Sequence, residues 1–89
     1  MAMSQQGLTK LLEELGELSQ IAAKKIAYID TDDHPDGMSM KTRMEDEMAD
    51  VMAAIMFVAD KFDLDKEKID NRIELKYARF TEWDNQPGN

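Results

Sequence analysis

Two pairs of carboxylates are spaced in a way that could support chemistry. Glu14 and Glu17 are three residues apart, and Glu47 and Asp50 repeat this spacing later in the chain. On a helix, each pair would lie on one face, one turn apart, where like charges repel. Carboxylate oxygens are the ligands that hard divalent cations prefer. Each pair therefore predicts either a metal site or an acidic face exposed to water.

The elements that must position these acids are predicted to be helices. Apolar residues recur at three- and four-residue steps in three long segments, and no segment shows the alternation typical of a strand. The segments are residues 4–29, 40–62 and 66–83. Residues 30–39 contain four Asp with Pro35 and Gly37, which predicts an acidic loop. Ser4 is a candidate N-cap of the first helix, and Asp63 or Asp65 of the third.

We therefore predict an all-α fold with one domain spanning residues 1–89. Two long antiparallel helices form a hairpin, and the third helix follows with weaker amphipathicity. Three helices of this length bury their apolar stripes incompletely, so we expect oligomerisation to complete a core like that of a four-helix bundle. The predicted assembly is a homodimer or a homotetramer built as a dimer of dimers.

Composition narrows the possible partners. The 89 residues include 19 acidic and 11 basic side chains, for a formal charge of −8. A chain this acidic is a poor binder of nucleic-acid backbones and of anionic lipid surfaces. It has no cysteine, no apolar run long enough to span a membrane and no apolar segment of signal-peptide type near Met1. These features favour a soluble cytoplasmic protein.

The position of the acids relative to the apolar stripes favours a shared site. On a helical wheel, Glu14 borders the stripe of the first helix, and Glu47 and Asp50 border that of the second. Antiparallel packing would bring the carboxylates of both pairs together at a half-buried edge. The alternative, a solvated acidic face, remains open for each pair alone.

The acidic pattern resembles the MazG family of all-α nucleoside triphosphate pyrophosphohydrolases, in particular its small, single-domain, phage-type members. The resemblance rests on Glu13-Glu14-x-x-Glu17 and on Glu47-x-x-Asp50-Val51. The tail from Arg72 to Trp83 is similar to that of the small members. Two features depart from the family pattern: the interval between the two acidic motifs is long, and the helix that precedes the first motif in many relatives is missing.

The resemblance implies an activity and roles for individual residues. It implies hydrolysis of a nucleoside or deoxynucleoside triphosphate between the α and β phosphates, giving monophosphate and pyrophosphate. The metal ligands and catalytic acids would be Glu14, Glu17, Glu47 and Asp50, with Glu13 supporting them and Mg²⁺ (or Mn²⁺ in its place) as the cofactor. The candidates for binding substrate are the cations Lys76, Arg79, Arg72, Lys25 and Lys24 and the aromatic residues Tyr28, Phe57, Tyr77 and Trp83.

Four other functions remain open. A non-catalytic helical interaction or regulatory dimer would need no metal, whereas a non-catalytic cation binder would need one. Phosphoribosyl-ATP pyrophosphohydrolases share the fold and the acids, but the His expected after the second acidic motif is absent, and Val51-Met52-Ala53-Ala54 stands there. Hydrolysis of dUTP is a further alternative within the same superfamily.

Overall fold

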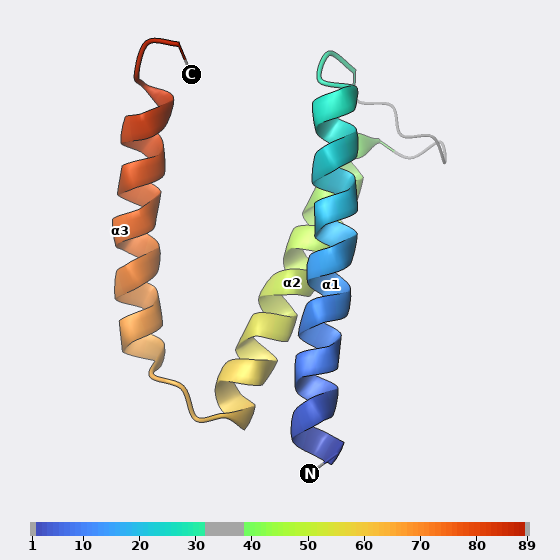
Figure 1. Ribbon diagram of the computed structural model, residues 1–89, viewed down its shortest axis with the longest axis vertical. Helices are drawn as coiled ribbons and strands as arrows, with labels where there is room; N and C mark the ends of the chain where they lie inside the picture. The colour runs from blue at the N-terminus through green and yellow to red at the C-terminus, as the bar shows by residue number, and fades with distance from the viewer. Residues whose placement is uncertain (1, 32–38, 89) are drawn as a thin grey trace.

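The computed structural model describes residues 2–31 and 39–88, with side chains from Gly7 onward, and these residues form three helices. They are α1 (Ala2–Ala27), α2 (Met40–Lys61) and α3 (Lys66–Asp84). The all-α prediction is confirmed. α1 and α2 run antiparallel and side by side, and α3 diverges from α2 (Figure 1). Most of the predicted acidic loop, residues 32–38, lies outside the described residues.

Local hydrogen bonds define the helix ends. The backbone N–H of Thr42 donates to the Ser39 hydroxyl at 3.0 Å, which caps α2. Of the two candidate caps for α3, Asp65 is used, because its carboxylate accepts from the N–H of Lys68 at 3.0 Å. α1 begins at Ala2, so Ser4 lies inside the helix and is not its N-cap.

The turn between α2 and α3 reverses the chain within a few residues. Asp63 adopts a positive φ of 51°, a left-handed conformation that Asp tolerates better than most residues. The N–H of Leu64 donates to the carbonyl of Ala59 at 2.9 Å and closes the end of α2. An ion pair between Lys66 and Asp60 spans the same turn. These contacts set the direction in which α3 leaves the hairpin.

α1 and α2 meet along one line of residues on each helix, which we call the seam. Its members are spaced three and four residues apart, as in a coiled coil, and each is buried or half-buried. The seam consists of Gly7, Leu11, Glu14, Leu18 and Ile21 on α1 and of Met40, Met44, Glu47, Val51, Ala54 and Val58 on α2. Two of these positions, which would ordinarily be apolar, carry glutamate.

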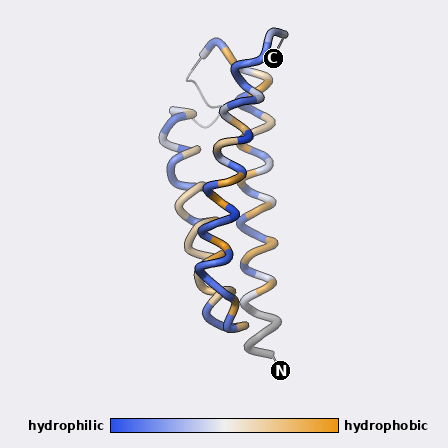
Figure 2. The backbone as a smooth tube through the Cα atoms, turned by 90° about the vertical axis from the view of Figure 1, so that its left-hand side faces the viewer, coloured by the Kyte–Doolittle hydropathy of each residue, from blue (hydrophilic) through white to orange (hydrophobic). Residues whose placement is uncertain are grey.

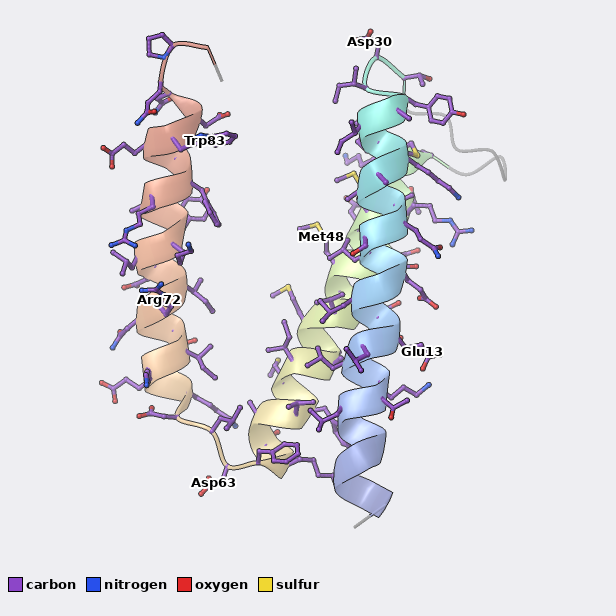
Figure 3. All side chains as sticks on the ribbon, in the orientation of Figure 1. Glu13, Asp30, Met48, Asp63, Arg72 and Trp83 are labelled. Carbon is purple, nitrogen blue, oxygen red and sulfur yellow. The ribbon has the colours of Figure 1, made fainter. Side chains whose placement is uncertain are left out.

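The seam divides the hairpin into two chemically different flanks. The polar flank holds Glu17, Lys24, Arg43 and Asp50. The apolar flank holds Leu8, Leu12, Leu15 and Ile26 of α1 and Met48, Met52 and Ile55 of α2, all of them exposed. Met48 projects on the side of the hairpin that faces α3, whereas Glu13 projects on the opposite side (Figure 3).

The contact between α1 and α2 covers only part of the apolar stripe of α1. Leu8 and Leu15 lie near the centre of this stripe on a helical wheel, yet they are 43% and 41% exposed. The seam follows only one edge of the stripe, the edge nearest the acids. Apolar positions also recur along α3 (Figure 2), but none of its residues, all described, is buried. None of the three helices is both long enough and apolar enough to cross a membrane.

Candidate metal centre

Three carboxylates from two helices converge at the middle of the seam. Glu14 of α1 and Glu47 and Asp50 of α2 each offer one oxygen, and these oxygens lie within 4.8 Å of one another. The antiparallel seam explains this arrangement, because Glu14 and Glu47 occupy facing seam positions and Asp50 lies one turn beyond Glu47 on the polar flank. The structure thus unites three of the four predicted ligands.

Burial makes this convergence costly without a compensating charge. Glu14 and Glu47 are half-buried, and the Oε2 atom of each is shielded from solvent. Neither of these oxygens accepts a hydrogen bond from any residue that the structure describes. A buried polar oxygen without a partner destabilises the fold, and a buried charge does so more strongly. A divalent cation would satisfy both oxygens and neutralise the repulsion between them.

The electrostatics of the acids reflect the same crowding. Burial raises the pKa of the Glu47 carboxyl above its ordinary value, and the neighbouring carboxylates of Glu17, Asp50 and Glu14 raise this pKa further. A hydrogen bond with Glu17 acts in the same direction, because it requires a proton on one of the two groups. Burial also raises the pKa of Glu14, with Glu17 as the next cause.

The remaining members of the first motif lie at the edge of the cluster. Glu17 is exposed on the polar flank, outside the group of three, but close enough to Glu47 to raise the pKa of its carboxyl. Glu13 is exposed and forms an ion pair with Lys10 at 3.3 Å. Glu13 is not a member of the group of three and offers no oxygen to the cluster.

A polar cavity of about 300 Å³ opens beside the acids, toward the C-terminal half of α1. Its lining combines two cations with two carboxylates and consists of Glu17, Gln20, Ile21, Lys24, Arg43 and Glu47. Arg43 was not recognised as a site residue in the sequence. The feature of the sequence that could have indicated Arg43 is its position four residues before Glu47, which places both side chains on the same side of α2.

A second cavity, of about 530 Å³, lies on the other side of the cluster. It is more apolar and is lined by Lys10, Glu14, Asp50, Ala53, Ala54 and Phe57. Glu14 and Asp50 therefore border one cavity, and Glu47 borders the other. A ligand held at the cluster could extend a charged group toward Lys24 and Arg43 and an aromatic group toward Phe57.

The other residues predicted to bind substrate lie away from the cluster. The Lys25 ammonium group donates to the carbonyl of Thr31 at 3.1 Å and so closes the end of α1. Tyr28 is exposed in the turn that follows α1. The remaining candidates lie on α3, which diverges from the hairpin (Figure 1). These candidates are Arg72, Lys76, Tyr77, Arg79 and Trp83. Within one chain, the structure does not bring these residues to the acids.

The site is understood from its own geometry. Comparisons of the chain with models of protein families, with curated proteins and with solved structures found no match.

Proposed function

We propose that the protein is a Mg²⁺-dependent nucleoside triphosphate pyrophosphohydrolase. The observation that carries this proposal is the convergence of Glu14, Glu47 and Asp50. Two of these residues hold a buried oxygen that has no hydrogen-bond donor among the described residues. Oxygen ligands on rigid helices suit a hard cation such as Mg²⁺, which binds proteins through few carboxylates and keeps positions for water and phosphate oxygens. Resemblance to the MazG acidic motifs adds the choice of substrate.

Each group of the site has a role in this proposal. Glu14, Glu47 and Asp50 hold the metal, and Glu17 is the fourth ligand that the resemblance implies. Mg²⁺ would polarise phosphoryl oxygens and lower the pKa of a bound water. Lys24 and Arg43 neutralise phosphate charge in the polar cavity. The base of the nucleotide occupies the more apolar cavity, against the Phe57 ring.

The proposal includes the assembly and the place of action. We propose a homodimer or homotetramer, because the apolar flank and the apolar stripe of α3 are exposed in a single chain. A cytoplasmic location, as predicted from the sequence, would give the enzyme access to its nucleotides. The roles of Arg72, Lys76, Arg79 and Trp83 in substrate binding remain predictions, and within one chain these residues lie away from the cluster.

A nucleotide panel tests the activity. Purified protein is incubated with Mg²⁺ and each common NTP and dNTP, with dUTP and phosphoribosyl-ATP included, and pyrophosphate release is measured. We expect turnover of at least one substrate, lost on addition of EDTA and reduced at least a hundredfold by Asp50→Asn or Glu17→Gln. Asp46→Asn is the matched control, because Asp46 is exposed on the same helix outside the cluster.

The result of the panel separates the alternatives. Release of orthophosphate alone, or activity that survives both Asp50→Asn and Glu17→Gln, would contradict the assigned chemistry. Stabilisation by Mg²⁺ without turnover of any nucleotide would identify a non-catalytic cation binder. No response to Mg²⁺ in either stability or activity would favour a helical interaction module.

A further inference from the structure

α3 carries an apolar stripe that the described part of its own chain does not bury. Ile69, Ile73, Tyr77, Phe80 and Trp83 follow one another at three- and four-residue steps and fall within an arc of roughly 120°. All except the half-buried Ile69 are 58% or more exposed. An isolated helix of this length is only marginally stable in water, so burial of an apolar face is its main source of stability.

The hairpin carries a matching apolar surface. Its apolar flank is exposed on both helices, with Leu12 at 70% and Met52 at 63%. This flank lies on the side of the seam opposite the acids and faces toward α3 (Figure 3). One chain therefore presents two apolar surfaces, and neither is covered by the part of the chain that the structure describes.

The exposed area indicates how much surface a partner must cover. The chain exposes 7224 Å², whereas a compact monomer of 10.2 kDa exposes about 5,300 Å². Its radius of gyration is 15.9 Å, compared with about 12 Å for a compact domain of this length. The excess of about 1,900 Å² per chain would give a dimer interface of about 3,800 Å², and obligate homodimers commonly bury about 2,000–5,000 Å².

The charge distribution indicates which surfaces meet. α3 has five basic and five acidic side chains and is formally neutral, so the whole charge of −8 is carried by the rest of the chain. Contact between two hairpins would bring like charges together. Contact between α3 and a hairpin brings no net repulsion and covers both apolar surfaces at once.

We propose that two copies of this chain exchange their third helices, so that α3 of each copy packs on the apolar flank of the hairpin in the other. A two-fold axis makes the two contacts identical and leaves neither stripe exposed. The acids lie in the seam and on the polar flank, so this interface is separate from the proposed activity and is tested independently of it.

Cross-linking between differently tagged chains tests the exchange. Because the chain has no cysteine, Met52→Cys can be placed in one chain and Ile73→Cys in another. After the chains are mixed, a short bis-maleimide should join them several-fold more efficiently than when Asn71→Cys replaces Ile73→Cys. Asn71 is a matched control, because it is exposed on the opposite face of α3.

Three results would overturn the exchange. The first is a cross-link that forms only within single chains carrying both Met52→Cys and Ile73→Cys, which would show α3 folded back on its own hairpin. The second is preferential joining of two Met52→Cys chains, which would show contact between hairpins. The third is a mass of 10.2 kDa at all micromolar concentrations in sedimentation. We expect twice that mass for the wild type. Phe80→Glu should raise the dissociation constant of the dimer at least tenfold, and Asn71→Glu should leave it unchanged. Both variants should keep the helicity of the wild type.

Discussion

Replacement of Glu47 by Gln should stabilise the metal-free protein. The Glu47 and Asp50 oxygens lie within 4.8 Å of each other, and two charges at this distance repel by about 1 kcal/mol in a water-like dielectric. That dielectric is appropriate because Asp50 is exposed. Gln removes this repulsion and brings donors to a site whose buried oxygens have none among the described residues. A gain of about 1 kcal/mol raises Tm by roughly 4–8 °C in a domain of this size.

The gain should depend on pH in a defined direction. Because the pKa of Glu47 is raised in the fold, the folded state binds more protons than the unfolded state above the ordinary value of 4.5. The stability of the wild type therefore falls as pH rises from 4.5 through the raised pKa, whereas the variant lacks this loss. The difference between the two proteins should be full at pH values above the raised pKa of Glu47 and disappear below pH 4.5.

Thermal melts with EDTA and with Mg²⁺, at one protein concentration, measure these effects. Binding of Mg²⁺ at a hundred times its Kd adds about 2.7 kcal/mol to the wild type, and Glu47→Gln should lose most of this gain. Glu45→Gln is the control, because it removes one charge from an exposed position of the same helix. A lower Tm for Glu47→Gln in EDTA, or an equal rise for Glu45→Gln, would refute repulsion within the cluster as the cause.

Further predictions concern the helices. Gly16→Ala should stabilise the chain by about 1 kcal/mol through helix propensity, because no described atom beyond the neighbouring residues and backbone of its own helix lies within 4 Å of the added Cβ. Gly7→Ala should raise the free energy of unfolding less, because its Cβ would lie 3.3 Å from the Phe57 ring. Equal increases for the two variants in urea denaturation would contradict the close approach of Gly7 to this ring at the seam. Ser39→Ala and Asp65→Ala each remove a helix cap and should lower the free energy of unfolding by about 1 kcal/mol in the same assay. An unchanged free energy of unfolding would show that these hydrogen bonds are not maintained in solution.

Much of the local structure could be predicted from residue types alone. Apolar periodicity located the three helices, because a helix needs one face that can be buried. Asp63 and Asp65 marked the second turn, although the choice of Asp65 as the cap required the backbone geometry. The spacing of Glu14, Glu47 and Asp50 was sufficient to predict their convergence once antiparallel packing was assumed.

The tertiary structure decided which edge of each apolar stripe is used. Periodicity gives the angles of side chains around a helix axis but does not choose the neighbour, because several pairings bury similar apolar area. The observed pairing of α1 with α2 places Glu14 and Glu47 inside the seam and brings Arg43 beside them. It leaves the apolar flank exposed. By itself, the sequence determined the helices and the spacing of the acids. Only packing decided that two of these acids each have a buried oxygen without a donor in the part of the chain that the structure describes, which is the physical reason for expecting a cation there.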